Sequence, residues 1–124
     1  MYKYSSDNEV LTSAQRSAGT GTTNFIPAKS YNHAIAVIYI TGKSGAPTLE
    51  VTLQCSPVNP ELDNSKWRNV YVEDLITDAM IGTSYPKIFG GHVQEDFTGW
   101  LRLKYVVAGA STPKLTFSCN LELK

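Results

Sequence analysis

Two stretches of the chain share one layout: YITGKSGAPTL at residues 39–49 and YVVAGASTPKL at residues 105–115 place Tyr, Pro and Leu at identical spacing. In each, an apolar strand precedes a loop of small residues, and Pro opens a return strand whose side chains alternate between two faces. Each stretch therefore predicts a β-hairpin. Two such hairpins indicate an all-β fold, an antiparallel two-sheet β-sandwich.

The strands around these loops differ in pattern. Residues 34–40 are apolar on both faces, which predicts a central strand covered on both sides or packed against a neighbouring subunit. Residues 48–55 alternate, with Leu, Val and Cys predicted to face inward and Thr, Glu and Gln to face solvent. Strands at 100–107 and 115–123 alternate in the same way, and we expect them to pair with each other.

Composition limits the function. The 124 residues suit one domain, and the 11 basic and 11 acidic residues cancel. Because charged residues make up 18% of the chain and are dispersed, we expect neither nucleic-acid nor membrane binding. The first residues contain no signal-peptide core, and no apolar run reaches 18 residues, so we expect synthesis in the cytoplasm and no transmembrane segment.

Residues 1–24 differ from the rest of the chain. They are rich in Ser, Thr, Gly and Asn and show no sustained period, which predicts a flexible N-terminal arm before a single sandwich domain at residues 25–124. Aromatic and apolar residues of the arm and of the predicted loops are the candidates for partner contacts. These candidates are Tyr2, Tyr4, Val10, Leu11, Phe25, Tyr31 and Trp67.

No catalytic motif is recognisable. Gly-Lys-Ser at 42–44 lacks the earlier glycine of a phosphate-binding loop and leads into a strand. Ser111 and Lys114 have the spacing of a serine nucleophile and its lysine base, but Pro113 prevents the helix that would align them. His33 and His92 belong to no recognisable motif. We therefore expect no enzyme activity, no catalytic residue, no cofactor and no small-molecule substrate.

Metal and disulfide chemistry are likewise not predicted. Cys55 and Cys119 are isolated and fall on the inward phase of their strands, which favours buried free thiols over a disulfide between them. No metal site is predicted, although a calcium loop that uses Asp63, Asn64 or Asp78 stays open, because irregular loops supply oxygen ligands without a spacing rule.

Several runs resemble the layout of small tailed-phage virion proteins: AIAVIYITG at 34–42, PTLEVTLQ at 47–54, WLRLKY at 100–105 and LTFSCNL at 115–121. They are similar to capsid decoration, or cement, proteins. The resemblance implies a jelly-roll form of the sandwich and a non-enzymatic role on the outer capsid surface of a virion. It also implies the major capsid protein as partner and a homo-oligomer, with a trimer favoured.

Two other functions stay open. The same scaffold suits a carbohydrate-binding or receptor-adhesin module, for which Trp67 is the residue to test. A tail or head-completion subunit of a virion is the other alternative.

Overall fold

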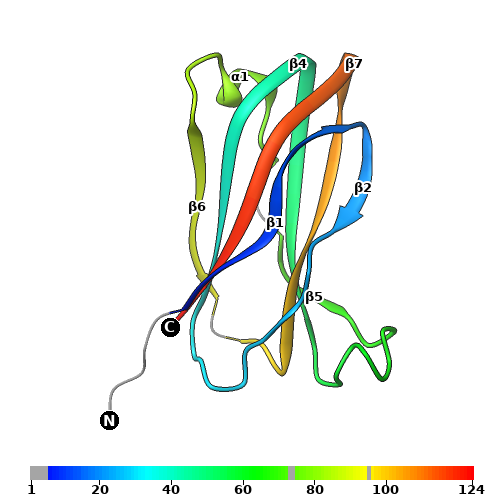
Figure 1. Ribbon diagram of the computed structural model, residues 1–124, viewed down its shortest axis with the longest axis vertical. Coiled ribbons are helices and arrows are strands. Elements are labelled where there is room, and N and C mark those ends of the chain that lie inside the picture. The colour runs from blue at the N-terminus through cyan, green and yellow to red at the C-terminus, as the bar shows by residue number, and fades with distance from the viewer. Residues whose placement is uncertain (1–5, 73–74, 95) are drawn as a thin grey trace.

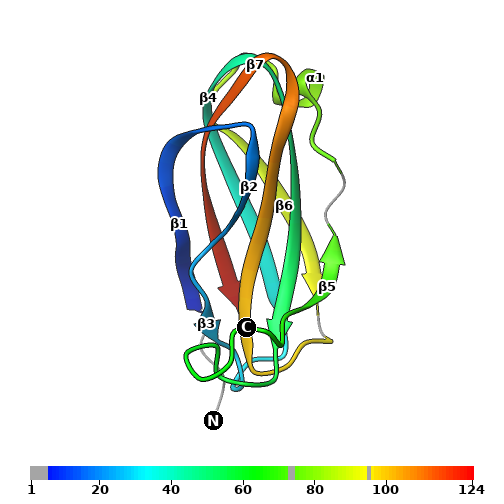
Figure 2. The same ribbon diagram turned by 90° about the vertical axis from the view of Figure 1, so that its right-hand side faces the viewer.

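The computed structural model describes residues 6–72, 75–94 and 96–124. Its frame is a pair of long strands, β4 (Ala34–Ser56) and β7 (Trp100–Leu123), which pair antiparallel along their whole length. Ala34 lies opposite Leu123 at one end of this ribbon, and Ser56 lies opposite Trp100 at the other. Both strands turn over at the same end of the molecule, so the ribbon folds back on itself (Figures 1 and 2). The bend divides the sheet into two layers.

Shorter strands complete both layers. In the first, here called the β1/β6 layer, β6 (Lys87–Gln94) pairs with the first half of β4 and β1 (Ser6–Ser17) with the second half of β7. In the second, the β2/β5 layer, β5 (Arg68–Val72) pairs with the second half of β4, and β2 (Gly19–Thr22) and β3 (Ile26–Pro27) pair with the first half of β7. A ribbon folded over in this way is a jelly-roll sandwich, which confirms the predicted all-β fold class.

The stretches with shared spacing, residues 39–49 and 105–115, are not hairpins, so that prediction was wrong. They pair with each other, with Ala46 opposite Ala110 and Pro47 opposite Gly109. The segments before and after each stretch lie in different layers and are already paired on both sides, so residues 100–107 do not pair with 115–123. The shared spacing has a physical cause: two strands of one ribbon must bend at the same level.

The core lies between the layers. The inward phases predicted for residues 49–55 and 115–123 are confirmed, since every odd-numbered side chain in both segments is buried. Tyr105 and Phe117 meet edge to face across the layers, with ring centroids 5.3 Å apart. Burial of each large apolar side chain contributes about 1.5–3 kcal/mol. Cys55 and Cys119 are both buried and free, so the disulfide alternative is excluded.

The expected N-terminal arm is part of the sandwich from residue 6 onward. β1 pairs with the C-terminal half of β7, and Val10 is a core residue. Arg16 holds the irregular part of β1, because its guanidinium donates to the carbonyl oxygens of Thr12, Ala14 and Phe117 and lies 4.8 Å from the Phe117 ring centroid. Within the single chain, β7 is therefore the neighbour against which this segment lies.

Helix α1 (Asp78–Ile81) lies beside the bend (Figure 1). Thr77 caps its N-terminus by accepting a hydrogen bond from the Met80 amide. Ile81 is buried in the core, and Ile76, just before the helix, forms an isolated bridge with Leu49 of β4. The helix thus closes one end of the core between the layers.

Candidate partner-binding surface

A cluster of aromatic and polar side chains lies on the outer face of the β2/β5 layer. Phe25, Trp67 and Arg102 form its outer part, which we call the Trp67 cluster; Phe25 is exposed, and the other two are half-buried. The Arg102 guanidinium lies 4.2 Å from the Trp67 ring centroid, and the Phe25 ring is tilted by 53° to the indole at a centroid distance of 6.3 Å. A guanidinium over an indole face is the strongest common cation–π pair, worth about 0.5–2 kcal/mol.

Gln54 fixes the position of the arginine. Its Oε1 accepts a hydrogen bond of 2.8 Å from Arg102 Nε, and its Nε2 donates a bond of 3.0 Å to Asn69 Oδ1. Because both ends of the amide are bonded, the orientation of the Gln54 side chain is determined by its partners. Gln54 is 8% exposed, and the neighbouring Thr52 is also buried. This part of the β4 outer face was predicted to be solvated, but the side chains above it exclude water.

The indole of Trp67 is held from the loop that follows β4. Its Nε1 donates a hydrogen bond of 2.7 Å to Asn64 Oδ1. Asp63 in turn accepts bonds from the amide and the hydroxyl of Ser65, which tightens the turn that carries Asn64. Trp67 therefore has a fixed orientation before any partner arrives.

The loop that leads to Trp67 also exposes apolar side chains. Leu62, on the same loop as Trp67, is 83% exposed, and Val58 and Phe25 are each 36% exposed. The loop extends from the end of the molecule opposite the bend (Figure 1). Tryptophan and arginine are among the residue types enriched at protein-binding hot spots.

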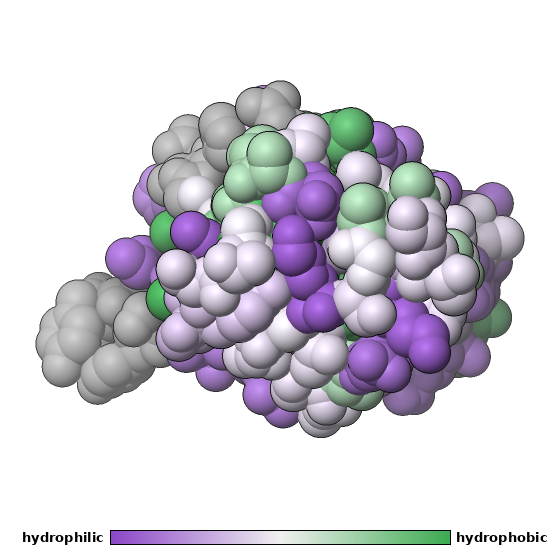
Figure 3. Space-filling model, turned by 90° about the horizontal axis from the view of Figure 1, so that it is seen from above, coloured by the Kyte–Doolittle hydropathy of each residue, from purple (hydrophilic) through white to green (hydrophobic). Residues whose placement is uncertain are grey.

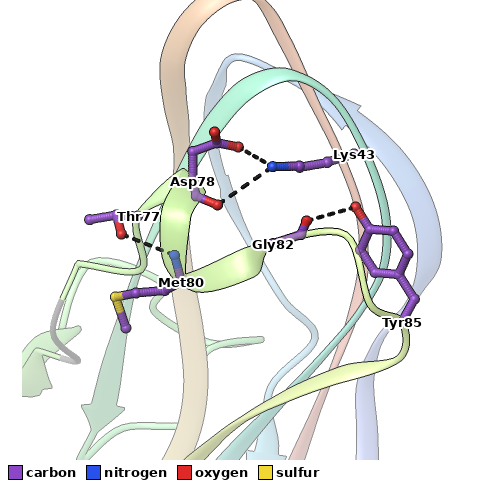
Figure 4. Close-up of polar contacts among 6 residues, drawn as sticks. All are labelled: Lys43, Thr77, Asp78, Met80, Gly82 and Tyr85. Atoms are coloured by element: carbon purple, nitrogen blue, oxygen red, sulfur yellow. Dashed lines mark hydrogen bonds and ion pairs between the residues drawn. The ribbon is translucent and has the colours of Figure 1, made fainter.

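The bend end carries a different set of polar contacts (Figure 4). Lys43 Nζ, from the bend of β4, lies 2.5 Å from Asp78 Oδ1 at the start of α1. The Tyr85 hydroxyl donates a bond of 3.2 Å to the Gly82 carbonyl oxygen, which ties the chain after the helix back to its end. Each of these contacts joins two parts of this chain, so the set pins α1 against the bend.

Viewed from above, this end of the molecule shows mostly weakly polar surface, crossed by hydrophilic residues (Figure 3). Hydrophobic colour is confined to small separate areas. Leu75, Met80 and Tyr85 are exposed near the helix, but the bend itself is built from Gly, Ser, Ala and Thr. The bend end therefore offers little apolar surface to a partner.

A third surface is the outer face of the β1/β6 layer. The strand at 34–40 is central, as predicted, because β6 and β7 flank it. Its outward side chains Ile35, Val37 and Tyr39 are half-buried within one copy, and Ile88 of β6, opposite Tyr39, is 59% exposed. This apolar strip fits the predicted packing against a second subunit.

The candidate contact residues from the sequence are therefore separated in space. Phe25 and Trp67 come together in the Trp67 cluster. Val10 is buried in the core, and Leu11 and Tyr31 pack against it. Tyr2 and Tyr4 lie outside the described residues. Arg102 was missed by sequence reasoning, because its place over an indole 35 positions away depends on the jelly-roll topology.

The residues considered for metal binding are bonded elsewhere. Asp63 is bound by Ser65, Asn64 by Trp67 and Asp78 by Lys43. Across residues 6–72, 75–94 and 96–124, no three His, Cys, Asp or Glu side chains are grouped to hold a metal ion. In the same described ranges, no helix has the length and apolar character needed to span a membrane.

Comparison of sequences finds no family model and no curated protein that match this chain. Comparison of structures finds similar folds. The VP2 subviral particle of infectious bursal disease virus matches with a TM-score of 0.62 at 12% identity, over 97% of this chain and 32% of that chain. Chains from the Gt and Gx strains of the same virus match with TM-scores of 0.61 and 0.60, each at 11% identity and over 97% of this chain.

The likeness concerns the fold. This chain spans about a third of the length of the viral chains that it matches. At 11–12% identity the shared property is the arrangement of strands, and side-chain chemistry is not carried over. The chain therefore shares its jelly-roll fold with part of these viral chains.

Proposed function

We propose that this chain is a non-enzymatic structural protein of a virion, which binds the outer surface of a phage capsid and stabilises it. The observation that carries the proposal is the match of 97% of the chain to a protein of a virus particle. The strand layout, which resembles that of phage cement proteins, supports the finer assignment. The partner would be the major capsid protein, repeated many times over one particle.

The cement role is mechanical. A compact sandwich with a fixed surface loses little conformational entropy on binding, so a modest contact area is enough at each site. If each copy also bridges neighbouring subunits, binding at one contact raises the effective concentration at the next. A decorated shell would then resist internal pressure better than a bare one.

Self-association is part of the proposal. The strip formed by Ile35, Val37, Tyr39 and Ile88 is the surface best suited to contact with another copy, because it is apolar and lies on the outer face of the β1/β6 layer. We propose a trimer. Light scattering at micromolar concentration tests the trimer, and a monomeric mass at that concentration contradicts it. If the chain does form an oligomer through this strip, Ile88→Lys should shift it toward smaller species.

Co-sedimentation tests the cement role. Purified chain is mixed with expanded capsids that lack decoration, and bound protein is counted after centrifugation. Hundreds of copies per particle, together with greater resistance of the particle to heat, are the expected result. A handful of copies would indicate a tail or head-completion subunit instead, and failure to sediment with capsids contradicts the proposal.

A carbohydrate-binding or receptor-adhesin module is the second candidate. The aromatic pair Phe25 and Trp67 favours it, because sugars stack their C–H faces on aromatic rings. A glycan array decides between the two functions. Sugar binding that is lost in Trp67→Ala favours the adhesin.

A further inference from the structure

The most informative unexplained group is the guanidinium of Arg102. Its Nε is bonded to Gln54 and its plane lies over Trp67. Within the described part of the chain, neither of its terminal nitrogens has a hydrogen-bond partner. An arginine presents five N–H donors, and the remaining donors are arranged in the fork that matches a carboxylate.

The side chains around the Arg102 guanidinium preorganise it for binding. Partial burial lowers the pKa of Arg102 from its ordinary value, yet arginine stays charged at every physiological pH. Gln54 and Asn69 beneath it, and Asn64 beside Trp67, hold the two side chains in place. A partner that binds here loses less entropy than one that must first order a free arginine.

Among the described residues, no carboxylate is bonded to the Arg102 guanidinium. Lys66 and Arg68 flank Trp67 in sequence. Glu61 and Asp63 lie on the loop, and the Asp63 carboxylate already accepts bonds from Ser65. The unused N–H donors of Arg102 therefore favour an anionic partner.

We propose that the Trp67 cluster docks a segment of the major capsid protein in which an Asp or Glu carboxylate stands beside an apolar side chain. The carboxylate would receive the terminal N–H groups of Arg102, and the apolar side chain would pack on Leu62, Val58 and Phe25. A protein segment is favoured over a sugar because two of the exposed residues, Leu62 and Val58, are aliphatic. The proposal rests on the capsid-binding function above and adds the chemistry of the partner.

Co-sedimentation with expanded capsids, measured as a binding curve, tests the proposal. Arg102→Gln should weaken capsid binding by about tenfold or more, because it leaves a partner carboxylate without its cation. Arg102→Lys should also weaken binding, since a lysine cannot form the two-pronged bond. Lys104→Gln is the matched control: it removes one positive charge from the same strand face, and its binding curve should stay close to that of the wild type.

Leu62→Ser gives a test that does not depend on the arginine. This side chain is almost fully exposed, so the variant should fold normally and still bind more weakly. Thermal unfolding of each variant confirms that the fold is intact.

The outcomes separate the two proposals. If the wild type does not sediment with capsids, the cement function fails and this inference fails with it. If the wild type binds and Arg102→Gln binds equally well, the inference alone is overturned. Equal losses in Arg102→Gln and Lys104→Gln would also overturn it, because net charge would then explain the binding. Capture of a glycan that is lost in Trp67→Ala would assign the cluster to a sugar instead.

Discussion

The bend end and the Trp67 cluster each hold a basic side chain in a fixed position, but they leave it in different states. Lys43 forms a closed ion pair with Asp78, which ties α1 to the bend of β4. Arg102 is fixed through its Nε and its ring contact, and its terminal donors point to no partner within the described residues. Both side chains are charged and partly buried. They differ in which N–H donors are already bonded, and only Arg102 keeps donors for a partner.

The largest expected effect comes from breaking the bend. Gly109 has a φ of 122°, and a Cβ there would overlap the carbonyl oxygen of Ala46 on the paired strand. Gly109→Ala should therefore reduce the free energy of unfolding by about 2–4 kcal/mol, measured by urea denaturation. Gly42→Ala is the matched control, because its Cβ would meet Thr116 at an ordinary 3.7 Å. Equal stability of the two variants would contradict the close crossing of the strands.

The second prediction concerns Cys119, which is buried in the core between the layers. Burial raises the pKa of the Cys119 thiol from 9.0 to about 12. The folded state therefore keeps the proton where the unfolded state loses it, so stability is complete below pH 9 and declines as pH rises toward 12. Unfolding curves between pH 8 and 11 measure this decline. Cys119→Ala should remove part of it, and an unchanged decline would show that other groups cause it.

The sequence predicted the layers of the fold better than their connections. The inward phase was correct along 49–55 and 115–123, because alternation depends on local burial, whereas the outward side chains Thr52 and Gln54 are covered by their neighbours. The hairpins and the arm were wrong, because a strand that bends between layers and a true hairpin have the same local pattern. Small polar residues in β1 also suit an edge strand, which needs few large side chains on its outer side.

The Trp67 cluster was only partly predicted from the sequence, because it too depends on how the strands are connected. Trp67 and Phe25 stood out as aromatic residues in segments with little core pattern. Arg102 and Gln54 gave no such indication, since each occupies a polar position on an alternating strand that reads as solvated. Their contact requires that β4 and β7 be neighbours in one layer, and that follows from the folded ribbon.

The third prediction tests whether the bend-end ion pair is purely structural. Asp78→Asn removes the charge that faces Lys43, and the pair is partly exposed, so we expect a loss of about 0.5–1 kcal/mol in unfolding free energy. The loss should shrink at high salt. Capsid binding should not change. A variant that keeps its stability but loses capsid binding would move the binding surface to the bend end and reverse the comparison.

The smallest expected effect lies in the turn that orients Trp67. Hydrogen bonds from Ser65 hold the pKa of the Asp63 carboxyl below its ordinary 3.8, so the turn is favoured above that pH and is weakened as the carboxylate is protonated in acid. Ser65→Ala should return the pKa of Asp63 toward 3.8 in an NMR titration while global stability stays nearly constant. In a Trp100→Phe background, the remaining indole fluorescence reports on Trp67 alone, and Ser65→Ala should shift it because Asn64 no longer holds the ring as firmly. If the titration moves and the fluorescence does not, the turn binds its own carboxylate without orienting the Trp67 cluster, and the preorganisation of that surface comes from Gln54 and Asn69.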